Sequence, residues 1–178
     1  MLTVIIDARP DPAALAATIA PLVRGVVEGI VGGAVLVAPA ADRAVEEIAD
    51  AAGCRVLVAS RWPEGFARAV AGAGGSGFLL VDTGLLIGPE FWPILADRLP
   101  LLQDRPAVTR PAARPGFAGM AARAAAILRE TGGRAGRDRA LLLPPRRARE
   151  IAAAKADPFA HPFGRDLVRL DPEVRRLP

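Results

Sequence analysis

The chain has 178 residues, of which 52% are hydrophobic and only 4% aromatic, a composition that suits one domain with a sizeable core. The single cysteine, Cys54, excludes an intrachain disulfide. The first residues lack the features of a signal peptide, and the apolar stretch 25–41 is interrupted by Glu28 and Pro39, so it is not a membrane span. We therefore expect one cytoplasmic domain over residues 1–178.

Charge is divided unevenly along the chain. Residues 1–100 contain seven arginines and eleven acidic residues, a net charge of −4, whereas residues 101–178 carry +8. A basic segment favours anionic partners such as phosphate groups or an anionic membrane surface, although a solvated arginine-rich surface has the same composition. No Tyr or Trp is interleaved with these arginines to stack on bases, so nucleic acid is not an expected partner.

Strands and helices are predicted to alternate through the first half. The expected strands are short apolar runs at residues 2–6, 34–37, 55–59 and 78–81. The last of them is uniformly apolar, which predicts burial on both faces. Helices are expected at 11–22, 41–52, from 63 to the glycine-rich segment 72–77, and from 89 to about 98. This order predicts an α/β fold with a mostly parallel sheet covered by helices.

The ends of two of these helices are marked by residues with known preferences. Asp11 and Pro12 favour an N-cap followed by the first helical residue. In residues 41–52 the apolar side chains Val45, Ile48, Ala49 and Ala52 share one helical face. Gly53 then favours the end of that helix.

The second half has weaker patterns. Four prolines within residues 99–116 predict a surface loop. An alanine-rich helix is expected at 118–129, followed by a flexible basic loop at 131–139. A further helix, opened by Pro144 and Pro145, is expected to end before Pro158.

The triplet Asp82-Thr83-Gly84 follows the fourth predicted strand and has two functional interpretations. Aspartic proteases carry this triplet, but they need two such carboxylates side by side within β-rich sequence. The chain contains one triplet, and helices separate its strands, so a protease, even a homodimeric one, is disfavoured. An Asp beyond a parallel strand instead lies where such sheets bind ligands. A turn residue that bonds its own backbone is the structural alternative.

Three segments share their order and spacing with a known family: "LTVIIDARPDPAALAATIAPL", "AVLVAPAADRAVEEIADAAGCRVL" and "EGFARAVAGAGGSGFLLVDTGLLIGPEFW". Residues 2–92 thereby resemble the first half of a family 2 glycosyltransferase of the GT-A fold. More loosely, "RDRALLLPPRRAREI" and "RDLVRLDPEVRRL" resemble the later segments of small bacterial members. The resemblance implies transfer of a sugar from a nucleotide-diphosphate donor to an unknown acceptor. It also implies a nucleotide-binding half at 1–98 and a basic acceptor-side half at 99–178.

The resemblance assigns roles to individual residues. Asp82 keeps the first position of the family's Asp-x-Asp motif, while Gly84 replaces the second carboxylate. Asp82 would then bind Mg²⁺ or Mn²⁺, which neutralises the diphosphate leaving group in such enzymes. Asp7 and Asp42 would lie beside the nucleoside, and the family's acidic pair is absent at Val37-Ala38. Asp42 also suits a helix N-terminus.

Other expected site residues depart further from the family pattern. Arg68 stands where many members have an Arg-Asn pair; it would contact a phosphate or remain a surface arginine. An inverting transferase needs a general base, but the expected acidic pair is missing near Phe163-Gly164, which leaves Asp157 and Asp166 as candidates. His161, the only histidine, is expected to be an exposed loop residue rather than a metal ligand.

These departures leave a second hypothesis open, a non-catalytic relative that serves as a binding or interaction module. A nucleotidyltransferase is disfavoured because the first loop, "DARPDPAALAA", lacks a glycine-rich phosphate cradle.

Overall fold

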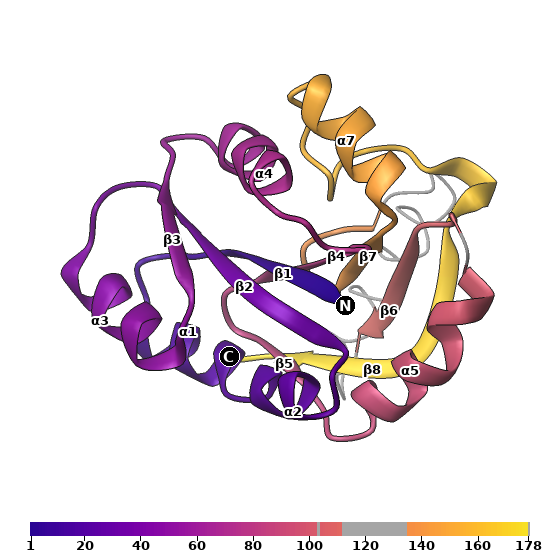
Figure 1. Ribbon diagram of the computed structural model, residues 1–178, viewed down its shortest axis with the longest axis horizontal. Coiled ribbons are helices and arrows are strands. Elements are labelled where there is room, and N and C mark those ends of the chain that lie inside the picture. Colours follow the sequence, from indigo (N-terminus) through magenta and orange to yellow (C-terminus); the bar gives the residue numbers. More distant parts are fainter. Residues whose placement is uncertain (103, 112–134, 178) are drawn as a thin grey trace, which may run out of the picture.

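The computed structural model describes residues 1–102, 104–111 and 135–177. One eight-stranded sheet runs through these residues in the order β3-β2-β1-β4-β7-β6-β8-β5 (Figure 1). The strands are β1 (Leu2–Asp7), β2 (Val31–Ala38), β3 (Arg55–Val58), β4 (Phe78–Asp82), β5 (Leu85–Ile87), β6 (Ala107–Pro111), β7 (Leu141–Leu143) and β8 (Val168–Arg176).

The four strands predicted in the first half are confirmed, and they lie parallel to one another. β1 pairs with β2 on one side and with β4 on the other, and β3 pairs with β2 at the sheet edge. β7 is antiparallel to β4 and β6, whereas β8 is parallel to β6 and antiparallel to β5. The sheet is therefore mostly parallel, as predicted, and it contains strands from both halves of the chain.

Helices cover both faces of this sheet (Figure 1). They are α1 (Pro12–Ile19), α2 (Leu22–Val27), α3 (Arg43–Ala52), α4 (Trp62–Ala71), α5 (Phe91–Leu102) and α7 (Pro145–Ala153). α1, α2, α3 and α5 pack on one face, and α4 and α7 pack on the other. In the described ranges, no helix combines the length and the apolar character needed to cross a membrane.

Two separate hydrophobic cores follow from the alternation of side chains along the strands. In β1, Val4 and Ile6 belong to the core under α1, α3 and α5, whereas Ile5 belongs to the core under α4 and α7. The same alternation occurs in β4, whose five residues are all buried. Successive side chains of a strand point to opposite faces, so a central strand with helices on both faces must be apolar throughout. This confirms the prediction for residues 78–81.

The helix caps confirm several local predictions. The Asp11 carboxylate accepts a hydrogen bond from the Ala14 N–H at the start of α1. Asp42 caps α3 by accepting from the N–H groups of Ala44 and Val45. Gly53 ends α3 with a φ of 66°, a left-handed conformation that costs glycine little.

Other details of the helices differ from the predictions. The helix expected to run through Leu22 ends at Ile19, and α2 begins as a separate helix at Leu22. Ala52, the last residue of α3, is exposed, whereas Val45 and Ala49 of the same face are buried.

The prediction of a loop over residues 99–116 is wrong in its described part. α5 continues through Pro100 to Leu102, whose buried side chain anchors the last turn. β6 follows at Ala107–Pro111, where the buried Ala107 and Val108 pair with β7. The prolines predicted a loop wrongly, because the buried apolar side chains of Leu102, Ala107 and Val108 stabilise the end of α5 and the strand β6. The helix expected at 118–129 lies outside the described residues.

Candidate functional site

Two carboxylates lie next to each other at the carboxyl ends of neighbouring parallel strands. Asp7 ends β1, Asp82 ends β4, and the two residues are register partners. The Asp82 side chain is completely buried, whereas 16% of the Asp7 side chain is exposed. Ligands of parallel sheets bind beyond this edge, so the predicted position of Asp82 is confirmed and Asp7 joins it.

The turn after Asp82 is fixed by hydrogen bonds to two distant segments. The Thr83 hydroxyl donates to the Asp7 carbonyl and accepts from the Arg9 N–H. Gly84 has a φ of 85°, and its N–H donates to the Thr18 hydroxyl of α1. The triplet therefore belongs to a parallel sheet of an α/β fold, a context unlike the β-rich barrel of aspartic proteases.

Three arginines from separate parts of the chain surround the Asp82 carboxylate. Arg176, at the end of β8, donates to Oδ2 from Nη2 at 2.7 Å, and Nη2 of Arg9 lies 3.2 Å from the same oxygen. Nη1 of Arg137 lies 3.6 Å from Oδ1, which accepts no hydrogen bond among the described residues. These cationic partners offset the free-energy cost of burying the carboxylate.

Arg137 links three carboxylates. It forms ion pairs with Asp7 and Asp82, and its Nη2 lies 3.3 Å from Oδ2 of Asp157. Its guanidinium also lies over the rings of Trp62 and Phe159, 5.7 and 5.3 Å from their centroids, within reach of a cation–π interaction.

The surroundings of Arg137 and Asp7 shift both pKa values. Burial raises the pKa of Asp7, and it outweighs the hydrogen bond and the charge of Arg137, which act in the opposite direction. Burial opposes the charge of Arg137, but the hydrogen bond to Asp7 and the negative charges of Asp7, Asp157 and Asp82 raise the pKa of its guanidinium. Arg137 is therefore a permanent cation held between acidic groups.

A cavity of about 460 Å³ opens beside this cluster. Arg9 and Arg176 line it together with Asp11, Thr83, Gly84 and the first residues of α1. Half of the Arg9 side chain is exposed, and the Arg176 side chain is 29% exposed. The cavity volume lies within the range of small-molecule sites.

The structure separates the sequence-predicted site residues into two groups. Asp7, Asp82 and Asp157 meet around Arg137. Asp42 caps α3, and the exposed Arg68 donates from α4 to the Val58 carbonyl. Asp166 pairs with Arg147 on the surface at 2.9 Å.

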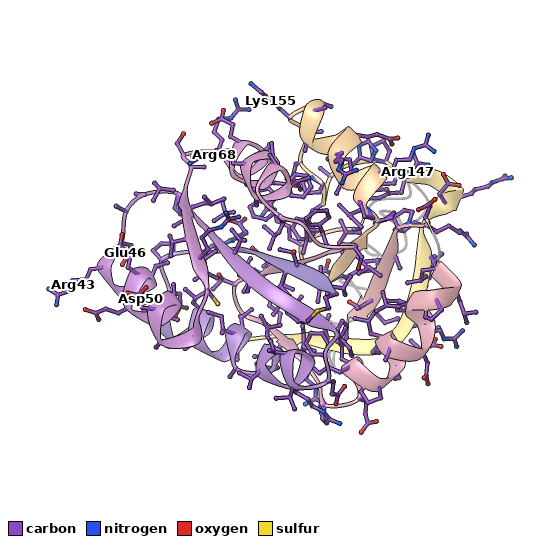
Figure 2. The ribbon with its side chains drawn as sticks, in the orientation of Figure 1. Arg43, Glu46, Asp50, Arg68, Arg147 and Lys155 are labelled. Carbon is purple, nitrogen blue, oxygen red and sulfur yellow. The ribbon has the colours of Figure 1, made fainter. Side chains whose placement is uncertain are left out.

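Figure 2 shows where the charged groups outside the cluster lie. Arg43, Glu46 and Asp50 project from the outer side of α3, Arg147 lies on α7, and Lys155 lies in the turn that follows α7. Within the basic second half, Arg146 and Arg147 pair with Glu150 on the surface. An anionic membrane partner for these arginines stays a prediction.

Sequence reasoning missed the three arginines that hold the cluster. Arg9 had a usable signal, because it follows Asp7 by two residues at the carboxyl edge of a predicted strand. The sequence places Arg137 only in a predicted flexible basic loop and Arg176 in a late segment that resembles the family. Their contacts with Asp82 join residues far apart in sequence, and no spacing rule reports such contacts.

The residues at this edge do not fit a resident divalent cation. Mg²⁺ and Mn²⁺ prefer several free oxygen ligands, but Oδ2 of Asp82 is bound by Arg176 and Arg9, and Gly84 offers no second carboxylate. Three carboxylates and three guanidinium groups leave no net negative charge to attract a cation. Within the described ranges, no three acidic, His or Cys side chains are grouped as metal ligands. A metal at Asp82 stays a prediction, and this donor set disfavours it.

His161 gives a test of the electrostatics near α7. It is partly buried, with its ring at the edge of Phe163 at 4.9 Å between centroids, rather than fully exposed as expected. Burial lowers the pKa of His161 below 6.5, and the charge of Arg147 lowers it further. As pH falls below 6.5 through the lowered folded pKa, the unfolded chain binds more protons and this contribution to stability is lost.

We expect a proton NMR titration of this single histidine to give a pKa below 6.5. Replacement Arg147→Gln should raise that pKa, whereas Arg146→Gln should change it less, because Arg147 is the arginine whose charge acts on the ring. Equal shifts in both variants would contradict the assignment to Arg147.

Comparison with known proteins identifies the fold. No protein-family model matches the chain, and no curated protein matches it. A solved structure of glucosyl-3-phosphoglycerate synthase from Mycobacterium tuberculosis with Mn²⁺, UDP and glucosyl-3-phosphoglycerate is 16% identical, with a TM-score of 0.63, and the match covers 100% of this chain and 72% of that one. The same synthase with Mn²⁺ and UDP-glucose gives 16% identity and a TM-score of 0.62, over 99% and 70% of the two chains.

The complex of that synthase with Mg²⁺ and UDP gives 16% identity and a TM-score of 0.63, over 100% and 72% of the chains. At such identities the similarity establishes architecture, so membership of family 2 in particular stays a prediction. The chain has the α/β fold of the GT-A-like glycosyltransferases.

Proposed function

We propose that this protein binds a nucleotide-diphosphate sugar at the carboxyl edge of its sheet and transfers the sugar to an acceptor. The observation that carries the proposal is the pairing of Asp7 and Asp82 at neighbouring strand ends, beside a cavity lined by Arg9 and Arg176. Polar groups that converge beside a cavity of this size are typical of a ligand site. Synthase structures of the same fold hold UDP or UDP-glucose, which supports a nucleotide-sugar donor.

Within this proposal, Asp7 lies beside the nucleoside and Asp157 is the candidate base. Asp157 belongs to the cluster around Arg137, whereas Asp166 pairs with Arg147 at the surface. A base must reach the acceptor hydroxyl that it deprotonates, so Asp157 is the better placed of the two. Asp42 accepts a hydrogen bond from the first turn of α3, and Arg68 donates to the Val58 carbonyl. Asp42 is therefore a secondary candidate for the nucleoside contact, and Arg68 for the phosphate contact.

A non-catalytic binding module is the second candidate. It is favoured because both carboxylate oxygens of Asp157 already accept hydrogen bonds. Arg137 donates to Oδ2, and the Phe159 N–H donates to Oδ1. A carboxylate held in this way is less free to accept a proton from an acceptor. This candidate keeps the donor site and lacks the transfer step.

Calorimetric titration with UDP and UDP-glucose tests donor binding. We expect both ligands to bind, and we expect Asp7→Asn to weaken binding about tenfold, the loss that corresponds to roughly 1.4 kcal/mol for one polar contact. Asp50→Asn, on the outer side of α3, is the matched control and should bind as the wild type does (Figure 2).

The release of UDP from UDP-glucose, measured with a panel of hydroxyl acceptors, separates the two candidates. Acceptor-dependent release supports the transferase, and binding without release supports the module. No binding of any nucleoside diphosphate or nucleotide sugar would contradict both.

A further inference from the structure

The cluster around Asp82 already contains its own cations. Arg9, Arg137 and Arg176 contribute three positive charges, and Asp7, Asp82 and Asp157 contribute three negative ones. Arginine remains protonated at any pH at which proteins fold. These charges therefore belong permanently to the chain and do not depend on a metal ion in solution.

Two of the arginines face the cavity while they hold the buried carboxylate. Nη2 of Arg176 and Nη2 of Arg9 both lie near Oδ2 of Asp82, and both side chains line the cavity. Each guanidinium has five N–H donors in a planar fork. Asp82 takes Nη2 of each guanidinium, and Nη1 of Arg176 also donates to the Arg137 carbonyl at 3.2 Å. Asp82 therefore positions the two arginines side by side, and each guanidinium keeps further N–H donors for a ligand.

The donor geometry of this pair suits a phosphate group. Guanidinium forks bind phosphate oxygens by short, charge-assisted and often bidentate hydrogen bonds. The same cavity is bordered by the first residues of α1, whose Ala14 N–H is already occupied by the Asp11 carboxylate. The arginines, and not the helix terminus, are therefore the anion-binding groups.

We propose that Arg9 and Arg176 bind the diphosphate of the ligand directly, and that no divalent cation takes part. Arg137 forms ion pairs with both Asp7 and Asp82, so it supplies the positive charge that a metal would bring to this edge. Asp82 acts as a positioning residue for the arginines. The inference rests on the proposed function for the identity of the nucleotide, but it concerns the diphosphate group alone.

Calorimetric titration tests this inference. Inorganic pyrophosphate is titrated in EDTA, and UDP is titrated once in EDTA and once in Mn²⁺. We expect both ligands to bind in EDTA, and we expect the UDP dissociation constant to change less than twofold when Mn²⁺ replaces EDTA. Binding should also weaken with added salt, because it rests on exposed charges.

Substitution of the arginines identifies the site. Arg9→Gln should weaken the binding of both ligands about tenfold or more, since it removes charge-assisted hydrogen bonds. Arg9 is half exposed, so this variant keeps the fold, and Arg176→Gln gives a second measurement. Arg43→Gln is the control, because that side chain is 89% exposed on α3 and pairs only with Glu47 among the described residues.

The outcomes separate this inference from the proposed function. Binding of UDP and UDP-glucose that requires Mn²⁺ would overturn the inference and leave the proposed function standing. Pyrophosphate binding in EDTA that depends on Arg9, without binding of any nucleotide sugar, would support the inference and contradict the proposed function. Binding that is unchanged in both arginine variants, or no binding of either probe, would overturn the inference.

Discussion

Replacement Asp82→Asn is expected to lower the free energy of unfolding by about 2 to 3 kcal/mol. Removal of one partner from a buried ion pair costs roughly 3 to 5 kcal/mol, and we reduce this figure because Arg9, Arg137 and Arg176 are partly exposed to solvent. Asparagine keeps the shape of the side chain but turns a pair of N–H donors toward guanidinium donors. The three arginines would then repel one another without a central charge.

Urea denaturation of the purified variant measures this loss. Asp50→Asn, at an exposed position on α3 (Figure 2), is the matched control, and we expect it to stay within about 0.5 kcal/mol of the wild type. If Asp82→Asn were equally mild, Asp82 would be a simple turn residue and would not hold the arginine cluster.

Replacement Arg137→Gln is expected to destabilise the protein by about 2 to 4 kcal/mol at neutral pH, in a pH-dependent way. Asp7, Asp82 and Asp157 lose the cation that they share. The hydrogen bond and charge of Arg137 are the main influences that lower the pKa of Asp7 against its burial. Without them, the folded-state pKa of Asp7 rises further above its ordinary value of 3.8.

The sign of the pH dependence follows from proton binding. Between pH 3.8 and the raised folded pKa of Asp7, the native variant binds more protons than the unfolded chain. Stability therefore decreases as pH rises through this window and is recovered as pH falls through it. The difference between wild type and variant should accordingly be largest at neutral pH and smaller in mildly acidic buffer.

Thermal and urea denaturation at a series of pH values from neutral to about 4 give this profile. Arg146→Gln serves as the control, because Arg146 is 79% exposed on α7 and pairs with Glu150. A difference between Arg137→Gln and the wild type that does not vary with pH would show that Arg137 acts by packing on Trp62 and Phe159 rather than by charge.

Residue patterns that depend on near neighbours were predicted well from the sequence. The apolar runs that became β1, β2, β3 and β4 are continuous in sequence, and the central strands β1 and β4 bury most of their residues. Asp11, Asp42 and Gly53 act on helix ends within a few residues of themselves. Hydrogen bonds of this range need no knowledge of the rest of the chain, so they can be recognised locally.

Elements that depend on partners distant in sequence were missed or mistaken. The segment of β8 contains Pro172 and alternating charges, and no strand was predicted there. It becomes a strand because β5 and β6 pair with it on both sides. β5 is three residues long and has no pattern of its own. Both owe their existence to hydrogen bonds across the sheet, which only the folded chain brings together.

The candidate site divides in the same way. By itself, the sequence determined that Asp7 and Asp82 end parallel strands and therefore lie at the ligand edge of the sheet. The tertiary structure decided what surrounds them, because Arg137 and Arg176 reach Asp82 only after their segments pack against the sheet edge. The physical reason is that an ion pair depends on distance in space, whereas strand and helix patterns depend on distance along the chain. For that reason the sequence suggested a metal at Asp82, and the folded chain placed arginines there.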